Sequence, residues 1–395
     1  MKYILIVPDG MGDRPIKNLN NKTPLEVSYK PNMDFLYQHG ICGRTNNTPK
    51  NLTPASDIAN MSILGINPLK VNLKRGPLEA LARDIPVGEK DIIFRMNFVT
   101  VQDGIMKDFT ADHISTENSK KLVKILEQKI ANKYNNAFHF FSGVSYRNIM
   151  VLKDTKLLKD KDALYTAPHD IIGKKIKSYL PPSSDITRKI MDESSIILND
   201  KRLNKTKANM IWLYGQGQIK KLPSFKERFN LKGGIISAVD LIHGLGKAMG
   251  LEIIRVPGAT SYFDTNYANK GRYALKALKY LDFIFIHIEA PDEAGHEGNI
   301  KEKILAIERI DRYIIGPILK SLKNKEFRLL LLPDHRTPIN IRTHTHDDVF
   351  FILYDSTKHN KLRKNDTLSE HCIDEKKEDI SFKRGWELLP FFLRT

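Results

Sequence analysis

Acidic and histidine residues gather in a few short segments of the chain, and their types suit metal binding. Carboxylate and imidazole together suit Mn²⁺, Zn²⁺ or a similar divalent ion, and six such ligands with one hydroxyl are enough for two sites. Two ions about 4 Å apart can clamp the attacking and leaving oxygens of a phosphoryl transfer. The candidate ligands are Asp9 in VPDGMGD, Asp292 and His296 in EAPDEAGHEG, Asp334 and His335 in LLPDHRTP, and His344 in RTHTHDD.

Each of these segments has an ordinary structural explanation when taken alone. An Asp-Gly pair after a strand is usually a turn, and an Asp-His pair lies more often on the surface than on a metal. Asp292 and His296 share one face if their segment is a helical turn, although the Ala-Gly between them also allows a loop. A buried group of uncompensated acids and imidazoles would be unfavourable without metal, so their joint appearance favours a metal centre.

Ser56, in LTPASDIANMSILGINP, is the candidate nucleophile because it lies at the expected N-terminus of a helix. The structural alternative is an N-cap, in which Ser56 or Asp57 accepts hydrogen bonds from free backbone amides. The two roles are compatible. A helix N-terminus stabilises an anion, and a metal-bound hydroxyl loses its proton more easily than a free one.

The elements that must position these groups are short apolar runs at residues 3–7, 283–288 and 329–332, separated by amphipathic stretches. This rhythm is typical of a parallel α/β sheet, which binds its ligands beyond the carboxyl ends of its strands. The residues that follow these runs are Asp9, residues 287–292, and Asp334 with His335. The expected sheet therefore brings the candidate ligands to one edge.

The pattern changes between about residue 80 and residue 205, where shorter runs such as IIFRMNFVTV, FHFFSGV and NIMVLKD alternate with Lys-rich helices. We interpret residues 81–204 as an inserted α/β domain. The core is expected to resume near NMIWLYGQG, which makes it discontinuous over residues 1–80 and 205–395.

Composition limits the classes of partner. The net charge of +17 comes mostly from scattered Lys, and no basic run is interleaved with regularly spaced aromatics. A solvated surface and a small anionic phosphate substrate are therefore expected, rather than a nucleic acid. Two cysteines indicate a reducing, cytoplasmic location. The opening MKYILIVPDG reads as a first strand rather than a signal peptide, and no apolar run approaches the roughly 20 residues of a membrane span.

Ordered motifs over nearly the whole chain resemble those of the archaeal-type 2,3-bisphosphoglycerate-independent phosphoglycerate mutases, a family of the alkaline phosphatase superfamily. The resemblance implies a mostly parallel sheet flanked by helices, with a smaller inserted α/β domain. The motifs that carry it are PDGMGDRP, PASDIANMSILGINP, RGPLEAL, FRMNFVTV, ADHISTE, GVSYRN, APHDIIGK, WLYGQG, GATSYFDTNYANK, HIEAPDEAGHEG, LLPDHRTP and RTHTHDD.

The same resemblance assigns the candidate ligands to two divalent ions, Mn²⁺ or Zn²⁺ with Mg²⁺ as an alternative, and to no bisphosphoglycerate cofactor. Ser56 would be the nucleophile that carries the phosphoryl group. One ion would be held by Asp292, His296 and His344, and the other by Asp9, Asp334, His335 and the Ser56 hydroxyl.

Groups that hold the substrate are expected in the insert, where the resemblance implies contacts with the carboxylate and hydroxyl of a phosphoglycerate. Arg can bind a carboxylate through two parallel hydrogen bonds, although Arg147 could equally form an ordinary ion pair. Lys270, in the core, could neutralise the phosphoryl group from the other side. The nominated insert residues are Arg95, His113, Arg147 and His169.

The expected activity is interconversion of 3-phosphoglycerate and 2-phosphoglycerate through a phosphoserine. A phosphatase, another mutase or a homoserine kinase-like enzyme of the same superfamily is the alternative, because Arg336 and Ser261 depart from the family pattern and specificity belongs to the insert. A metal-stabilised protein without catalysis and a nucleic-acid-binding protein are the remaining hypotheses. The sequence leaves the oligomeric state open.

Overall fold

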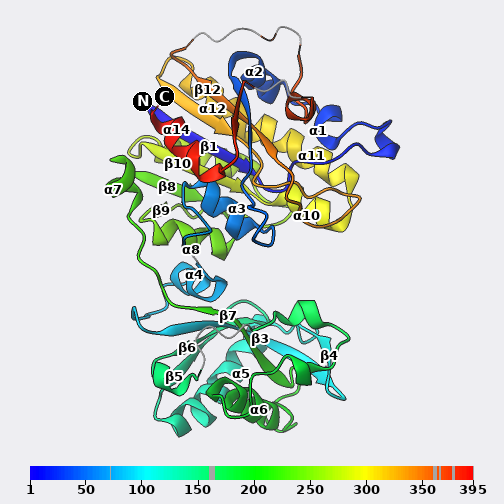
Figure 1. Cartoon of the computed structure of the whole chain (residues 1–395), viewed down its shortest axis with the longest axis vertical. Helices are drawn as coiled ribbons and strands as arrows, with labels where there is room; N and C mark the ends of the chain where they lie inside the picture. The colour runs from blue at the N-terminus through cyan, green and yellow to red at the C-terminus, as the bar shows by residue number, and fades with distance from the viewer. Residues whose placement is uncertain (72, 160–164, 359–362, 364–365, 376–378, 395) are drawn as a thin grey trace. The chain divides into compact units, whose positions relative to one another are not determined.

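The computed structural model describes residues 1–71, 73–159, 165–358, 363, 366–375 and 379–394, and the chain forms two compact units. The core unit comprises Met1–Asn72 and Leu222–Thr395, and the insert unit comprises Leu73–Lys221. Figure 1 labels the elements of both units. No helix in the described part of the chain is both long and apolar enough to cross a bilayer.

The core unit is built on an eight-stranded sheet. All neighbouring strands are parallel except for β12, which runs antiparallel to both of its neighbours. The central strands are fully buried apolar runs such as FIFIHI and FRLLL, as expected for strands covered on both faces. In spatial order they are β13 (Ile380–Phe382), β2 (Ile41–Thr45), β12 (Val349–Asp355), β11 (Phe327–Leu331), β1 (Lys2–Pro8), β10 (Phe283–Ile288), β8 (Gly233–Ile236) and β9 (Glu252–Ile253).

Helices cover both faces of this sheet (Figure 1). One face packs in a single apolar cluster against α2, α9, α11, a π-helix (Asp311–Ile315) and α12. On the other face, Phe392 of α14 contacts Tyr3, and α8 packs on Ile235. The core helices are α1 (Pro24–Val27), α2 (Pro31–His39), α3 (Ser56–Ile63), α7 (Phe225–Phe229), α8 (Asp240–Ala248), α9 (Tyr267–Ala277), α10 (Ala290–Glu297), α11 (Ile300–Ile310), α12 (Gly316–Leu322), α13 (His371–Asp374) and α14 (Leu388–Arg394).

The three apolar runs identified in the sequence are β1, β10 and β11, and they lie side by side with β1 in the middle. The predicted α/β class with a mostly parallel sheet is therefore confirmed.

The insert unit has its own antiparallel sheet centred on the long strand β3, with a separate apolar core. β3 pairs with β4, β6 and β7, and β5 pairs with β6. The elements of this unit are β3 (Ile92–Gln102), β4 (Ile105–Asp108), β5 (Phe138–Phe141), β6 (Arg147–Leu152), β7 (Met210–Gly217), α4 (Arg75–Ala82), α5 (Thr116–Lys129) and α6 (Ile186–Leu198).

Both joins between the units differ from the predicted boundaries. We expected the core to resume at NMIWLYGQG, but this segment is β7, which pairs with β3 and buries Trp212 in the core of the insert. We expected residues up to 80 to lie in the core as well, but residues 75–80 belong to α4, which is part of the insert unit. The insert therefore spans residues 73–221 rather than 81–204, because both segments pack on β3.

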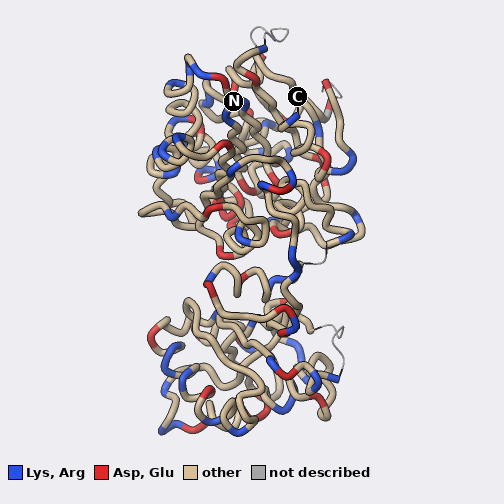
Figure 2. Tube along the Cα trace, turned by 90° about the vertical axis from the view of Figure 1, so that its left-hand side faces the viewer, with Lys and Arg blue, Asp and Glu red and all other residues tan. Residues whose placement is uncertain are grey.

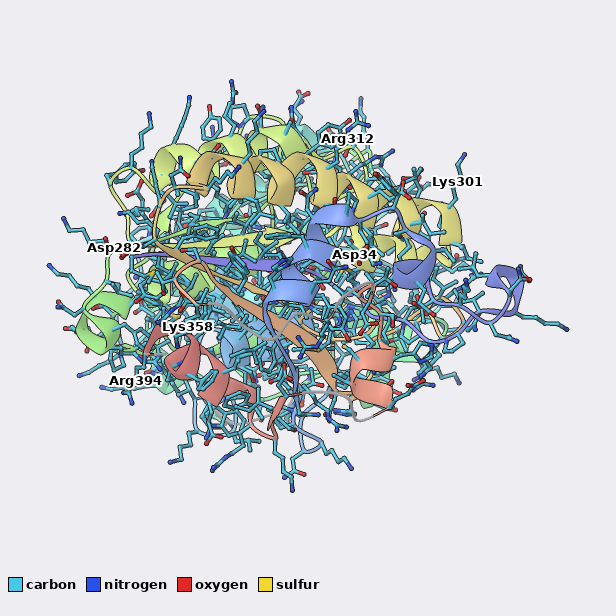
Figure 3. All side chains as sticks on the ribbon, turned by 90° about the horizontal axis from the view of Figure 1, so that it is seen from above. Asp34, Asp282, Lys301, Arg312, Lys358 and Arg394 are labelled. Atoms are coloured by element: carbon cyan, nitrogen blue, oxygen red, sulfur yellow. The ribbon has the colours of Figure 1, made fainter. Side chains whose placement is uncertain are left out.

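Basic side chains are dispersed, as their scatter along the sequence predicted. Figure 2 shows Lys and Arg positions throughout both units, interspersed with Asp and Glu. Seen from above in Figure 3, Lys301 lies on the opposite side of the view from Lys358 and Arg394.

Candidate active site

The candidate ligands converge because β1 lies between β10 and β11 and runs parallel to both. Asp9 directly follows β1, Asp334 and His335 follow β11 within a few residues, and α10 starts just after β10. The strand ends thus bring residues more than 300 positions apart in sequence to one edge of the sheet.

The first group contains Asp9, Asp334 and His335, each of which offers an atom within 4.8 Å of the others. His335 Nε2 lies 3.5 Å from Asp9 Oδ1 and 3.5 Å from Asp334 Oδ2. The Ser56 hydroxyl lies 3.3 Å from the same Nε2 atom. Ser56 is the first residue of α3, and the N-cap is Ala55, so the hydroxyl is not used as a cap.

The second group surrounds Asp292. His296 Nε2 lies 3.1 Å from Asp292 Oδ2, and His344 Nε2 lies 3.5 Å from Asp292 Oδ1. The two Nε2 atoms are 2.9 Å apart. Asp292, His335 and His344 also form a set within 4.8 Å, so His335 stands between the two groups. Asp292 and His296 both lie on α10, as the helical reading of their spacing predicted.

All three histidines are oriented through Nδ1. The Nδ1 atom of His296 lies 3.0 Å from the Arg342 carbonyl oxygen, and that of His344 lies 3.2 Å from the Pro54 carbonyl oxygen. In His335 the Nδ1 atom meets the Thr337 hydroxyl at 3.2 Å, and that hydroxyl donates to Asp292. Because these oxygens accept, Nδ1 carries the proton and Nε2 is left facing the acids, which is the arrangement found in metal-ligating histidines.

The electrostatics of the cluster fit a bound cation. Burial raises the pKa of Asp9 well above its usual value, and the nearby Asp334 and Asp292 raise it further. Asp9 Oδ1 is also buried without a hydrogen-bond partner among the described residues. A divalent ion would satisfy this oxygen and neutralise the crowded acids, so the donor set fits the metal that the sequence predicts.

In the group around Asp292, protons shared with the histidines supply part of the neutralisation that a metal ion would provide. Burial alone would raise the pKa of Asp292, but hydrogen bonds from His296 and His344 lower it well below its usual range. Donation of the same hydrogen bond to Asp292 raises the pKa of His296 to about 9. Metal binding to this group therefore has to displace protons at neutral pH.

Two supporting residues were not identified from the sequence. Asn60 donates to Asp334 Oδ2 at 2.9 Å and to the Ser56 carbonyl at 2.8 Å, so it joins the nucleophile helix to a ligand. The sequence spacing could have identified Asn60, because a residue four positions after Ser56 lies on the same helix face. Gly10 has a φ of +58° and donates to Asp334 Oδ1, and a Cβ there would lie 2.4 Å from Asp292 Oδ1.

Two of the nominated insert residues belong to a basic cluster within that unit. Arg95 is buried, pairs with Glu79 at 2.9 Å and lies 5.4 Å from the Tyr214 ring. His169 lies 6.3 Å from the same ring, and its pKa is lowered by burial and by Arg75 and Arg95. Arg95 on β3 and His169, in a short 3-10 helix (Pro168–Ile171), thus lie against the same tyrosine ring.

The remaining nominated residues are placed differently. Arg147 is exposed and lies against the Tyr146 ring. Burial lowers the pKa of the Arg95 guanidinium, and the nearby charge of Arg147 lowers it further. His113 is exposed in a left-handed backbone conformation, and no described contact joins it to Arg95. Lys270 is fully buried in the core unit, where its ammonium donates to the His287 carbonyl at 2.9 Å and lies 3.7 Å from Glu289.

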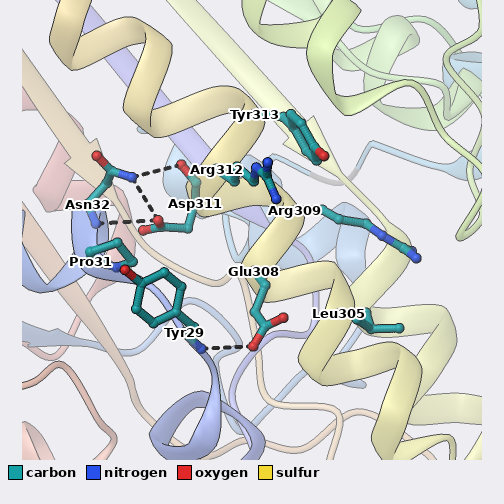
Figure 4. Close-up of a pocket in the computed structure, with 9 residues that line it drawn as sticks. All are labelled: Tyr29, Pro31, Asn32, Leu305, Glu308, Arg309, Asp311, Arg312 and Tyr313. Atoms are coloured by element: carbon teal, nitrogen blue, oxygen red, sulfur yellow. Dashed lines mark hydrogen bonds between the residues drawn. The ribbon is translucent and has the colours of Figure 1, made fainter.

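A cavity of about 450 Å³ opens elsewhere on the core unit, beside α11 and the π-helix (Figure 4). Asp311 accepts hydrogen bonds from Asn32 there, and Glu308 accepts one from the Tyr29 amide. None of the predicted site residues lines this cavity, so it is separate from the acid and histidine cluster.

Comparison with known proteins identifies the family of this chain. The Metalloenzyme superfamily model matches residues 1–372. A 2,3-bisphosphoglycerate-independent phosphoglycerate mutase from Methanothrix thermoacetophila is 46% identical over 364 residues, which cover 89% of this chain and 90% of that protein. The structure of the PH0037 protein from Pyrococcus horikoshii aligns with a TM-score of 0.79 at 26% identity, covering 99% of this chain and 96% of that one. A cofactor-independent phosphoglycerate mutase from Thermoplasma acidophilum aligns with a TM-score of 0.65 at 25% identity, covering 100% and 99%.

Proposed function

Because this chain belongs to the Metalloenzyme superfamily and to its 2,3-bisphosphoglycerate-independent phosphoglycerate mutases, we propose that it interconverts 3-phosphoglycerate and 2-phosphoglycerate through a phosphoserine on Ser56. The observation that carries the proposal is the Ser56 hydroxyl, 3.3 Å from His335 Nε2 and unused as a helix cap. His335 in turn belongs to both acid and histidine groups.

We assign one divalent ion to the group around Asp292 and the other to the group that includes Ser56. When bound, the ions supply charge that favours the ionised serine and offsets the charge of the phosphoryl group. Mn²⁺ or Zn²⁺ is proposed, with Mg²⁺ as the alternative. The ligands are Asp292, His296 and His344 for the first, and Asp9, Asp334, His335 and Ser56 for the second.

Each half-reaction exchanges one oxygen–phosphorus bond for another. In the first half, Ser56 Oγ loses its proton and bonds to phosphorus, while the bond to the 3-oxygen of glycerate breaks and that oxygen gains a proton. In the second half, the 2-hydroxyl of glycerate loses its proton and takes the phosphoryl group, and Ser56 regains a proton. The sum is an isomerisation that consumes no co-reactant.

The chain's own residues hold Ser56 ready for this transfer. Asn60 links the Ser56 carbonyl to Asp334, so the start of α3 is fixed relative to the acids. The N-terminus of α3 also favours negative charge at the serine oxygen and on the phosphoryl group.

We propose that basic side chains of the insert bind the glycerate carboxylate and hydroxyl. Arg95 supports this role because its Nε atom is buried and lacks a hydrogen-bond partner among the described residues. A bidentate contact would use that donor and hold glycerate between the two transfers, which prevents its loss to water. The proposed set is Arg95, His113, Arg147 and His169, and it leaves out Lys270, whose buried ammonium lies beside Glu289.

An enolase-coupled assay tests this function. Metal-loaded protein given 3-phosphoglycerate without bisphosphoglycerate should yield 2-phosphoglycerate, and excess chelator should abolish the activity until Mn²⁺ is restored. Release of inorganic phosphate without 2-phosphoglycerate would indicate a phosphatase instead. The cytoplasmic location expected from the low cysteine content is part of the same proposal.

A further inference from the structure

A chain of buried charged groups extends from the acid cluster into the core unit. His287 Nε2 lies 3.3 Å from Asp9 Oδ2, and His287 Nδ1 lies 3.0 Å from Glu289 Oε1. The other Glu289 oxygen lies 3.7 Å from the Lys270 ammonium. These four side chains are at most 5% exposed, so water does not screen their interactions.

Both ring nitrogens of His287 are engaged by neighbouring side chains. Its Nε2 atom faces Asp9 and also lies 3.5 Å from the Asn60 amide nitrogen, and its Nδ1 atom faces Glu289. Glu289 is itself fixed, because the Ser237 hydroxyl donates to its Oε1 atom at 3.1 Å. The imidazole is therefore held between Asp9 and Glu289.

The backbone holds His287 in this position. His287 pairs with Val7 across β10 and β1, and the Asp9 amide donates to the Ile288 carbonyl at 2.9 Å. Asp9 and His287 are thus fixed to each other by the sheet as well as by their side chains. The second group differs, because the described partners of Asp292 are Thr337, His296 and His344, and both of these histidines are themselves candidate ligands.

We propose that His287, fixed by Glu289, is a positioning residue that orients Asp9 and thereby sets the divalent-ion affinity of the group containing Ser56. The inference rests on the proposed function, since it assigns Asp9 as a ligand. Partners that orient metal ligands typically change affinity by about 10-fold to 100-fold when they are removed. A purely structural ion network would change stability without changing that affinity.

The test is a calorimetric Mn²⁺ titration of chelator-treated full-length protein, which is expected to resolve two sites in the wild type. Glu289→Gln keeps the side-chain shape but removes the charge that fixes His287. It should weaken one site about 10-fold to 100-fold and leave the other unchanged. The two titrations, with and without Glu289→Gln, are then repeated in a His296→Asn background, which disables the group around Asp292. Glu289→Gln should still weaken Mn²⁺ binding at the site that remains.

Asp355→Asn is the matched control. Like Glu289→Gln, this substitution converts a buried, ion-paired carboxylate to an amide. Asp355 lies 2.8 Å from Arg328 in the core sheet and contacts no candidate ligand. The substitution should lower the thermal unfolding temperature and leave both Mn²⁺ affinities unchanged. Ser237→Ala is a milder second variant, which removes the donor to Glu289 and also an acceptor for the Val239 amide. It is expected to weaken Mn²⁺ binding a few-fold at the same site.

Unchanged Mn²⁺ affinity in Glu289→Gln and Ser237→Ala, with only stability lowered as in Asp355→Asn, would overturn the inference and leave the proposed function intact. If Glu289→Gln does not fold, Ser237→Ala decides between the two readings by itself. A wild-type protein that takes up no divalent ion would instead overturn the proposed function, and the inference with it.

Discussion

The two units of this protein hold their functional side chains in different ways. In the core unit, the acids and histidines leave the ends of adjacent strands, and the acids are almost completely buried. In the insert unit, the nominated residues sit on strands and loops, and three of the four are exposed. The comparison indicates that sheet topology fixes the transfer chemistry, whereas individual side chains adjust what is bound.

Removal of His335 should have the largest effect, because it is the one residue that belongs to both acid and histidine groups. His335→Ala is expected to lower kcat by roughly 10³-fold or more, since both charge-stabilising sites are disturbed together. His296→Ala touches one group and should retain more Mn²⁺ in equilibrium dialysis. Equal metal content in the two variants would contradict the central place of His335.

The metal-free core should lose stability as pH rises from about 6.5 to about 10. Burial opposes charge on His287, but Glu289 and Asp9 raise its pKa to about 10. A raised pKa contributes stability that is complete below the unfolded value and is lost as pH passes through the folded value. The loss should be on the order of a few kcal/mol.

Urea unfolding at several pH values measures this effect, and His287→Gln is the comparison. The raised pKa of Asp9 acts in the same direction, so only the difference between wild type and variant isolates His287. A wild-type profile as flat as that of the variant would show that His287 is neutral in the fold.

Arg95→Gln should raise KM for 3-phosphoglycerate by about 10-fold to 100-fold, because a charge-assisted hydrogen bond contributes about 1.5 to 3 kcal/mol. Metal affinity should not change, since Arg95 belongs to the insert unit. Arg202→Gln is the control, because Arg202 is 89% exposed in the same unit. Loss of Mn²⁺ binding in Arg95→Gln would break the division of roles between the units.

His113→Asn should have the smallest effect, a rise in KM of about 2-fold to 10-fold, because an exposed hydrogen bond competes with water. Asn tolerates the left-handed backbone at this position, where φ is +49°, so the fold should be retained. Steady-state kinetics beside Arg95→Gln measure the difference. An unchanged KM would remove His113 from the substrate site.

The meeting of Asp9, Asp292, Asp334 and His335 was predictable because these residues closely follow apolar runs, and parallel strands bring such positions together. The end of the insert unit at β7 was not predictable. The apolar and aromatic residues of MIWLYGQG suit pairing with β3 and pairing with a core strand equally well. His287 belongs to the stretch 287–292 that the sequence marked, but the sequence assigned it no role. It is the fifth residue of FIFIHI, and only the register with β1 reveals that it faces Asp9.

Departures from the family pattern also needed the structure. Arg336 is nearly buried, and its guanidinium donates to the carbonyls of Asp13 and Asp348, so it braces the loops beside the ligands. Nothing in its position indicates a change of substrate. Lys270 appeared in the sequence as a partner for the phosphoryl group, yet its charge is engaged by Glu289.

Phosphorylation of Ser56 during turnover tests the account most directly. Wild-type protein quenched while converting 3-phosphoglycerate labelled in its phosphoryl group should carry label on Ser56, detected by peptide mass spectrometry. Ser56→Ala should remain folded, carry no label and make no 2-phosphoglycerate. Near-normal mutase activity in Ser56→Ala, or label released as inorganic phosphate without passing through Ser56, would contradict the account.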